Sequence, residues 1–423
     1  MRFLHAADIH LDSPLRGLSR YEGAPEETLR GATRRALVNL VDRALKLKVD
    51  FLLLAGDLYD GDWPDYNTGL FFTAQMARLN QADIPVVAIC GNHDAQSKIT
   101  RGLKLPSNVT MLSVDEPETV LFEEHQVAIH GQGFKTQAVW DDLTQNYPTA
   151  RAGYFNIGLL HTGLEGRPGH ASYAPCTLDG LKSLGYDYWA LGHIHQREIL
   201  SEEPYIVYCG NIQGRHARET GPKGATLVTV SDGQVHSLEH IPLDVVRWER
   251  LEVDISHSDS ADQVLQLVGE RLQEALQSLD DHVLAARIIT VGRGPAHTEF
   301  VGRRDHWVNE IRNLGLQVGH ESIWVEKVKF KSTTATDLED LASQHDAFSS
   351  LLEGLEQLAG DEDKLKTLGE ELFGELERKL PLAWRDSKAG GLSPTSLESL
   401  KEALGDVGHI LAVKLSEKAG QST

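Results

Sequence analysis

The first ninety residues alternate between short apolar runs and longer segments with helical periodicity, and this order restricts the fold more than any other feature of the chain. Apolar runs at 2–7, 50–55 and 85–90 predict strands, and the segments 30–48 and 67–81 predict the helices between them. Strands that alternate with helices in this way form a parallel sheet with right-handed crossovers. The amino-terminal part of the chain is therefore predicted to be an α/β domain.

From residue 109 onward the pattern changes to short strands that tight turns connect. Further strands are predicted at 156–160, 188–191 and 205–209. The segments 225–230 and 234–241 predict a β-hairpin, because Asp232-Gly233 between them is typical of a two-residue turn. We therefore expect an α/β fold in which two sheets pack face to face as a β-sandwich and helices flank the sandwich.

The chain has 423 residues, enough for two or three domains, and its character changes twice. Residues 1–245 form the predicted sandwich. Residues 246–332 again alternate strands and helices and predict a small α/β capping domain, which is a candidate for DNA contacts. Residues 333–423 contain no strand pattern and predict an acidic helical region rich in leucine.

Composition limits the compartment and the partners. The three cysteines lie far apart without the spacing of a metal site, which favours a reducing cytoplasm. No stretch is long and apolar enough for a membrane span, and the chain begins without a signal sequence, so we expect a cytoplasmic protein without membrane contact. The net charge is −21, from 41 basic and 62 acidic residues, which disfavours a protein that binds nucleic acid mainly by neutralising phosphates.

Polar and ionisable side chains follow five of the predicted strands, at the point where each strand ends. These residues are Asp8, His10, Asp57, Asn92, His93, Asp94, His161, His193 and His195. Taken alone, Asp8-x-His10 and Gly56-Asp57 have an ordinary alternative as turns, and His161 has one as a satisfied histidine. Ligands of α/β sheets bind beyond the carboxyl ends of the strands, so together these residues are expected to converge. Nitrogen and oxygen donors without thiolate fit Mn, Fe, Mg or Zn.

This set of motifs resembles the calcineurin-like metallophosphoesterase superfamily. Three longer runs resemble its DNA repair exonuclease branch, which includes SbcD-like nucleases and, most similar of all, the bacterial YhaO-type proteins. They are Phe-Leu-His-Ala-Ala-Asp-Ile-His-Leu-Asp from residue 3, Ala-Gly-Asp-Leu-Tyr-Asp from residue 55 and Tyr-Cys-Gly-Asn-Ile-Gln-Gly-Arg from residue 208. The resemblance in motifs covers residues 1–245.

The resemblance implies a site for two divalent metal ions, most readily Mn, with Mg, Fe or Zn as alternatives. Asp8, His10 and His195 would hold one ion, Asn92, His161 and His193 the other, and Asp57 would bridge them. His93 would stabilise or protonate the leaving oxygen. Asp94 would orient the His93 ring, with a helix N-cap as the alternative role. Arg215 and Arg218 lie in a basic loop that would touch substrate phosphates, unless the loop is merely solvated.

The activity implied is that of a metal-dependent DNA nuclease, a phosphodiesterase subunit of a DNA repair complex. The alternative is a phosphodiesterase for small substrates such as cyclic nucleotides. The chain has Asp60 where some nucleases of this branch have histidine, and it lacks the arginine that follows this position in protein phosphatases. It also lacks the phosphate-binding loop of ATPases. The resemblance implies an SMC-like coiled-coil ATPase partner docked on the C-terminal helices, and a homodimer is a further expectation.

Overall fold

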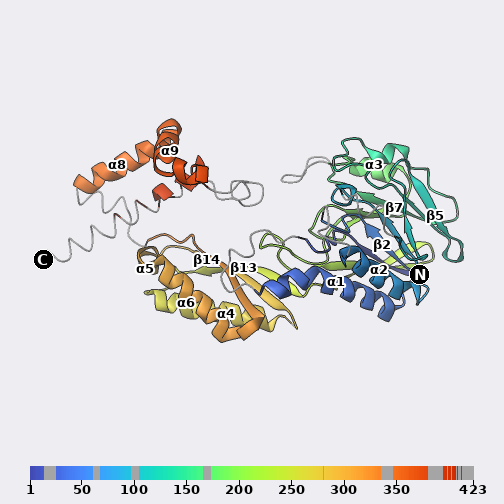
Figure 1. Cartoon of the computed structure of the whole chain (residues 1–423), viewed down its shortest axis with the longest axis horizontal. Helices are drawn as coiled ribbons and strands as arrows, with labels where there is room; N and C mark the ends of the chain where they lie inside the picture. Colours follow the sequence, from blue (N-terminus) through green and yellow to red (C-terminus); the bar gives the residue numbers. More distant parts are fainter. Residues whose placement is uncertain are drawn as a thin grey trace. The chain divides into compact units, whose positions relative to one another are not determined.

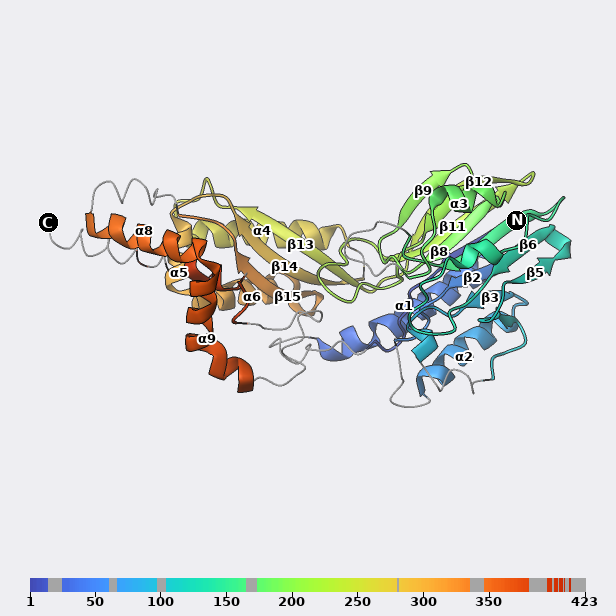
Figure 2. The same cartoon turned by 90° about the horizontal axis from the view of Figure 1, so that it is seen from above.

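Figures 1 and 2 show a computed structural model of the chain. It describes residues 1–13, 25–60, 67–96, 104–164, 173–279, 281–334 and 346–379, with short stretches between 394 and 411. The chain divides into two compact units. One unit consists of Met1–Arg250, Leu276–Ala286 and Glu321–Glu326, and the other of Leu251–Ala275, Arg287–His320 and Lys327–Thr423.

Two six-stranded sheets form the centre of the first unit (Figure 1). In spatial order the first sheet contains β12 (Gln234–Pro242), β11 (Gly224–Ser231), β1 (Arg2–Ala6), β2 (Phe51–Ala55), β3 (Val86–Ile89) and β4 (Val109–Met111). The second contains β5 (Glu118–Phe122), β6 (Val127–Gly131), β7 (Phe155–His161), β8 (Tyr188–Gly192), β10 (Tyr205–Tyr208) and β9 (Glu198–Glu202). Strands β1 to β4 pair in parallel, and so do β6, β7, β8 and β10.

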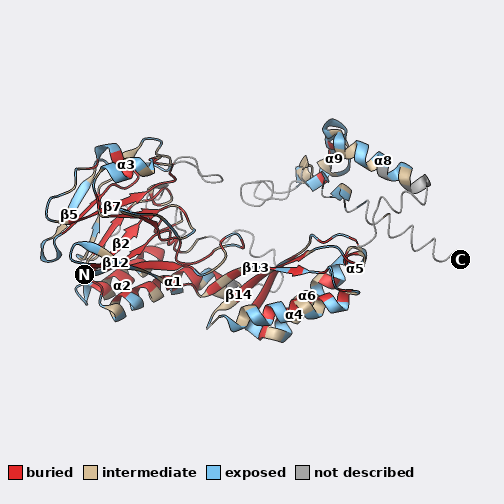
Figure 3. Cartoon of the chain, turned by 180° about the vertical axis from the view of Figure 1, so that it is seen from behind, coloured by how far each residue is buried: buried red, intermediate tan, exposed pale blue. Residues whose placement is uncertain are grey.

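The inner strands β2, β3, β6, β7 and β8 are buried on both faces, which explains their continuous apolar sequences (Figure 3). In β2, Phe51, Leu53 and Ala55 face a core shared with residues of the second sheet. The alternate residues Leu52 and Leu54 face a core shared with α1 (Glu26–Leu47) and α2 (Asn67–Asn80). The predicted sandwich flanked by helices is confirmed.

Several short elements in this unit have no counterpart in the sequence prediction. Helix α3 (Leu178–Ser183) has six residues, of which Leu181 alone is buried, so no helical periodicity develops. Strand β9 lies at the edge of its sheet and pairs with β10 alone, and its sequence alternates too weakly to stand out. Helix α1 begins at Glu26, four residues before the predicted start.

A third sheet of three strands contains β13 (Val246–Asp254), β14 (Val283–Val291) and β15 (Ile323–Phe330). Helices α4 (Ala261–Gln277), α5 (Ala296–Gly302) and α6 (Arg304–Gly319) connect these strands (Figure 2). The buried residues of α4 are Ala261, Val264, Val268 and Leu272, the spacing expected of one helical face. Two further helices follow, α8 (Asp346–Gly360) and α9 (Glu362–Lys379). Within the described ranges, every helix is too short or too polar to cross a lipid bilayer.

Candidate metal centre

The carboxyl ends of strands from both sheets meet at one edge of the sandwich. Asp8 and His10 follow β1, Asp57 follows β2, and Asn92 and His93 follow β3. In the second sheet His161 ends β7, while His193 and His195 follow β8. Three sets of ligand atoms gather at this edge. Within each set, all ligand atoms lie within 4.8 Å of one another. The predicted convergence of distant strand ends is therefore present in the structure.

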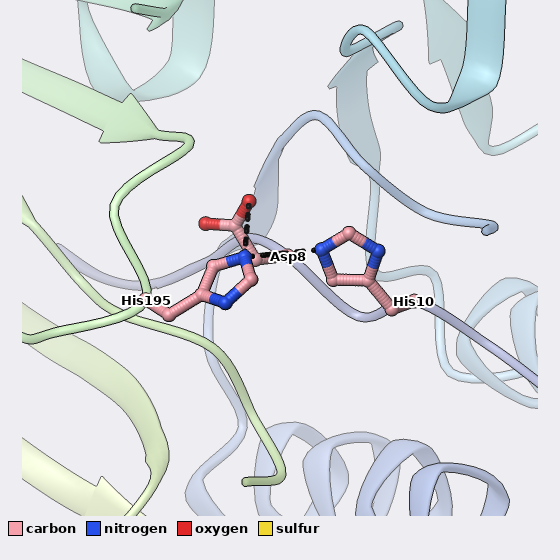
Figure 4. Close-up of side chains that lie close together, drawn as sticks. All are labelled: Asp8, His10 and His195. Atoms are coloured by element: carbon pink, nitrogen blue, oxygen red, sulfur yellow. Dashed lines mark hydrogen bonds and ion pairs between the residues drawn. The ribbon is translucent and has the colours of Figure 1, made fainter. Parts of the chain in front are cut away.

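Asp8, His10 and His195 form the first ligand group (Figure 4). The Nε2 atoms of the two histidines lie 3.1 Å apart, and His195 Nε2 lies 3.9 Å from Asp8 Oδ1. The Nδ1–H of His195 donates to Glu219 Oε1 at 2.6 Å, so Nε2 is the ring nitrogen that faces the other members of the group.

The second ligand group contains Asp57, His161 and His193. Asn92 joins this group, since its Oδ1 lies 3.0 Å from His161 Nε2 and 3.2 Å from His193 Nδ1. The Nδ1–H of His161 donates to the backbone oxygen of Ala55 at 2.9 Å. This bond leaves Nε2 as the ring nitrogen that faces Asn92 and Asp57, the atom that would bind a metal ion. Burial acts to lower the pKa of His161, but the charge and hydrogen bond of Asp57 raise it to about 9, so a bound metal ion would take the place of the proton on Nε2.

Asp57 lies between the two groups. Its Oδ2 is 3.8 Å from His10 Nε2 and 3.4 Å from His161 Nε2, while its Oδ1 accepts the backbone N–H of His93 at 2.9 Å. Burial acts to raise the pKa of Asp57, but the rings of His161, His10 and His93 hold it far below its ordinary range. The side chain is therefore a carboxylate anion that faces both ligand groups at once.

These residues fit divalent metal ions on grounds of their own chemistry. Asp8, His10 and Asp57 are almost fully buried, and His10 Nδ1, 3.7 Å from Asp60 Oδ1, makes no hydrogen bond to any residue that the structure describes. Burial raises the pKa of Asp8, since a carboxylate in this position lacks water. Two imidazole nitrogens facing each other at 3.1 Å, beside buried carboxylates, are stabilised when their lone pairs share a cation. The donors are nitrogen and oxygen atoms, a set that fits Mn, Fe, Mg or Zn.

Backbone strain accompanies the site. Asp8, His10, Asp57 and His193 have positive φ angles of 51°, 44°, 51° and 98°, a region that side chains other than glycine rarely adopt. Such conformations persist when the surrounding structure fixes them, and they concentrate at functional sites.

Gly91 is the position where added bulk has the clearest effect on this site. A Cβ there would lie 2.2 Å from Asp57 Oδ1. Gly91→Ala is expected to displace Asp57 and lower the affinity for Mn²⁺ at least about tenfold, as when supports of metal ligands are lost. Isothermal titration calorimetry of the metal-free protein measures this change.

Gly31→Ala is the matched control, since a Cβ on Gly31 in α1 meets nothing within 4 Å. This variant should keep its metal affinity and gain about 1 kcal/mol in unfolding free energy from helix propensity. Equal metal affinities in the two variants would contradict the position assigned to Asp57.

The carboxylate that orients the His93 ring is Asp60, which corrects the role predicted for Asp94. Asp60 Oδ1 lies 2.7 Å from His93 Nδ1. The carboxylate of Asp94 instead accepts the backbone N–H groups of Leu58, Tyr59 and Gly91 at 3.1, 2.9 and 2.9 Å. Asp94 thus joins the end of β3 to the end of β2, a structural role that takes up both of its oxygens. Asp60 is recognisable in the sequence only as the residue three positions after Asp57.

The environment of His93 favours its protonated ring. Burial acts to lower the pKa of His93, but the hydrogen bond to Asp60 and the charge of Asp57 raise it above its usual value. Asp60 also accepts a hydrogen bond from Ser13 Oγ at 2.5 Å and lies 3.4 Å from Arg215 Nη1. These partners fix the carboxylate that holds the ring.

Glu219 is a residue of the site that the sequence analysis missed. It is buried, and besides the ring of His195 it accepts the Arg215 backbone N–H at 2.7 Å and Asn211 Nδ2 at 3.0 Å. Glu219 therefore couples the loop after β10 to His195, a candidate metal ligand. A single glutamate in a loop rich in glycine and arginine carries no spacing that would have revealed this contact.

Glu219→Gln should lower the affinity for Mn²⁺ by about 10- to 100-fold, because the ring of His195 loses the anion that fixes its tautomer. Titration calorimetry on the metal-free variant measures the affinity for Mn²⁺, and circular dichroism verifies the fold. Glu202→Gln, at an exposed glutamate of β9, is the control and should match the unaltered chain. An unchanged metal affinity in Glu219→Gln would show that His195 is oriented without it.

The two arginines of the predicted basic loop lie in different positions relative to the ligand groups. Arg215 reaches the site, where Nη2 lies 3.8 Å from Glu219 Oε1 and 3.5 Å from His195 Nδ1. Arg218 is exposed, and its backbone N–H donates to the ring of His216. The charge of Arg215 is thus engaged by carboxylates of the site, while the side chain of Arg218 lies outside the ligand groups.

Comparisons with known proteins agree with this geometry. Residues 1–197 match the family model of calcineurin-like phosphoesterases, and residues 248–333 match the model of the middle domain of metallophosphoesterase YhaO. The chain is 36% identical over 299 residues to the metallophosphoesterase YhaO of Bacillus subtilis (strain 168), with 70% of this chain and 72% of YhaO covered.

Solved structures with a similar fold have little sequence in common with this chain. A dimetal phosphatase from Danio rerio is 13% identical with a TM-score of 0.35, covering 55% of this chain and 93% of its own. The protein TT1561 of Thermus thermophilus is 14% identical with a TM-score of 0.32, covering 56% of this chain and 96% of its own. From the family models and the identity to YhaO, this chain belongs to the calcineurin-like phosphoesterases and carries the middle domain of the YhaO metallophosphoesterases.

Proposed function

We propose that this chain is a metal-dependent DNA nuclease, the phosphodiesterase subunit of a DNA repair complex. The observation that carries the proposal is the position of Asp57 between two groups of nitrogen and oxygen ligands, 3.8 Å from His10 and 3.4 Å from His161. The histidine pair of the second sheet and the Asp60–His93 pair complete the arrangement. The resemblance of the motifs to the SbcD-like and YhaO-type exonuclease branch supports DNA as the substrate.

The two ligand groups would hold two divalent ions, Mn by preference, with Asp57 shared between them. When bound, these ions would supply an activated water and Lewis-acid stabilisation of the phosphoryl oxygens. Asp60 keeps the Nδ1–H of His93 occupied, so Nε2 is the atom from which the ring would protonate the leaving oxygen. The raised pKa of His93 supports its role as the general acid.

The engagement of Arg215 favours a diester over a monoester substrate. Protein phosphatases of the superfamily use an arginine after the position of Asp60 to clamp a phosphomonoester, and this chain has Gly61 there. Arg215 approaches the same carboxylate from another loop, but Asp60 and Glu219 already neutralise its charge. Among the residues that the structure describes, the centre therefore lacks the extra uncompensated cation that a doubly charged phosphomonoester would need.

A phosphodiesterase for small substrates is the second candidate, and the net charge of −21 favours it, because an acidic surface repels a DNA backbone. One experiment compares the two functions. The full chain is stripped of metal, reloaded with MnCl2 and incubated with labelled single- and double-stranded DNA, supercoiled plasmid, cyclic nucleotides and p-nitrophenyl phosphate. We expect DNA cleavage that requires Mn²⁺ and is lost in Asp57→Asn. Hydrolysis of cyclic nucleotides or of the monoester with the DNA left intact would overturn the nuclease proposal.

We further propose that an SMC-like coiled-coil ATPase docks on the C-terminal helices and supplies the basic DNA-binding surface that this acidic chain needs. Leu372 and Leu376 support this proposal, since they lie one turn apart on α9 and are 63% and 54% exposed. Co-expression with a candidate coiled-coil ATPase of the SMC-like class, followed by light scattering, tests the proposal and also detects a homodimer. The complex should be lost when both leucines are replaced by aspartate and kept in Leu70→Asp, at an exposed leucine of α2.

A further inference from the structure

We propose that Trp140 and Tyr173 form a stacking subsite for an unpaired nucleobase beside the metal centre. This inference rests on the proposed function and narrows its substrate to nucleotide phosphodiesters with an exposed base next to the scissile bond. The ring of Trp140 packs against that of Tyr173 with centroids 5.2 Å apart and a tilt of 54° between the two planes. The ring of Tyr173 in turn lies edge-on to His193, with centroids 5.8 Å apart. The aromatic pair thus leads directly from a metal-ligand candidate outward.

Trp140 is exposed where the other described tryptophans are buried. Its side chain is 65% exposed, whereas Trp189, Trp248, Trp307 and Trp324 are buried. An indole ring is among the largest apolar surfaces a side chain can leave in water, and each Å² of it costs about 25 cal/mol. A tryptophan that packs on one ring and leaves the rest of its surface open is suited to receive a second flat ring.

The loop that carries Trp140 is fixed to the metal centre at its base. Phe134, in the segment after β6, is buried and contacts the ring of His161 edge-on, with centroids 5.4 Å apart. The backbone N–H of Phe134 donates to the oxygen of Cys90 at 2.8 Å, directly before the motif that contains Asn92. The loop therefore starts in contact with His161 of the second sheet and with Cys90, two residues before Asn92, at the end of β3 in the first sheet.

Backbone hydrogen bonds fix the far end of the same loop and the segment of Tyr173. The N–H of Ala174 donates to the oxygen of Val139 at 2.7 Å, next to both aromatic residues. The N–H of Gly163 donates to the oxygen of Tyr173 at 2.8 Å, two residues after His161. Both aromatic rings are thus carried by backbone that is hydrogen-bonded to the end of β7, so a ring stacked on them would have a defined place relative to the metal ligands.

Stacking also explains how a chain with an acidic net charge could bind a nucleic acid. A nucleobase presents a neutral π-face, and stacking on an aromatic side chain contributes affinity without cationic side chains and with little dependence on base identity. Because the net charge is −21, binding of DNA through its phosphates alone is unfavourable. The metal centre would hold the phosphate of a nucleotide, and the aromatic pair would hold the base of the same nucleotide. Bases inside a duplex have both faces covered, so single-stranded or frayed DNA is the substrate that fits.

The test compares Trp140→Ala and Trp140→Phe in the full, Mn-loaded chain. The substrates are a single-stranded oligodeoxynucleotide and the same strand with abasic sites flanking the scissile bond. Trp140→Ala should raise KM for the complete strand about tenfold, within the range of one stacked base, and leave KM for the abasic strand unchanged. Trp140→Phe should restore most of the loss, and Leu70→Ala, at an exposed apolar residue elsewhere, should change neither value. Equal effects on both strands, or none, would overturn the subsite.

A binding measurement separates this proposal from the nuclease proposal. His93→Ala, loaded with metal, is titrated with oligo(dT) while tryptophan fluorescence is recorded, with and without the further change Trp140→Phe. Quenching that disappears with Trp140→Phe supports the stacking subsite even if the chain cleaves no DNA. Cleavage of DNA without any quenching assigned to Trp140 would remove the subsite and leave the nuclease function standing.

Discussion

Asp57→Asn is expected to lower phosphodiester hydrolysis by at least about a thousandfold and to remove bound metal, the largest effect of any single substitution in this chain. A factor of this size corresponds to about 4 kcal/mol of lost transition-state stabilisation. The physical reason is that Oδ2 of Asp57 faces His10 and His161 at the same time, so both ligand groups lose their shared anion. Elemental analysis of bound metal and hydrolysis of bis-p-nitrophenyl phosphate measure the two effects.

Asparagine is a suitable replacement because it keeps the shape of the residue. Its amide oxygen can still accept the backbone N–H of His93, which Asp57 Oδ1 accepts at 2.9 Å. The change therefore removes a charge while the strand end keeps its hydrogen bond. Asp42→Asn, at an exposed aspartate paired with Arg78, is the matched control and should retain metal and activity. If Asp57→Asn retained two equivalents of metal, the bridging position would be assigned wrongly.

His93→Ala should lower kcat by about 10²- to 10⁴-fold, the usual contribution of a general acid, and leave the metal content unchanged. The loss should be largest for substrates whose leaving oxygen needs a proton, such as a deoxyribose hydroxyl. It should be much smaller for p-nitrophenolate, which leaves as a stable anion. A comparison of kcat for DNA and for bis-p-nitrophenyl phosphate therefore isolates the proton transfer.

The metal content of the same variant decides between two roles for His93. Ligand atoms of His10, Asp60 and His93 also lie within 4.8 Å of one another, an arrangement that could itself hold an ion. Loss of one metal equivalent in His93→Ala would make the residue a ligand and contradict its role as an acid. As a single substitution, Asp60→Asn should reduce kcat. Combined with His93→Ala, it should reduce kcat little further, because two residues that act as one unit have non-additive effects.

The sequence alone determined the sandwich and the ligand residues. Apolar runs such as 51–55 are buried on both faces, so their periodicity and order predict parallel strands without any knowledge of the loops. Asp8 and Asp57 lie two residues after such strands and His161 ends one, and parallel strands bring their carboxyl ends to one edge. Their convergence is therefore a consequence of local sequence and sheet geometry. Elements such as α3 escaped prediction because six residues are too few for a periodic pattern.

The tertiary structure alone decided which side chains support the ligands. Asp94 is adjacent to His93 in sequence, yet its carboxylate is taken by three backbone amides, and Asp60 from another strand end orients the ring. Glu219 reaches His195, and Trp140 reaches Tyr173, through loops whose conformation no periodicity encodes. Strand ends are positioned by regular backbone hydrogen bonding, which sequence pattern predicts. Loop side chains are positioned by contacts between distant segments, and these exist only once the chain has folded.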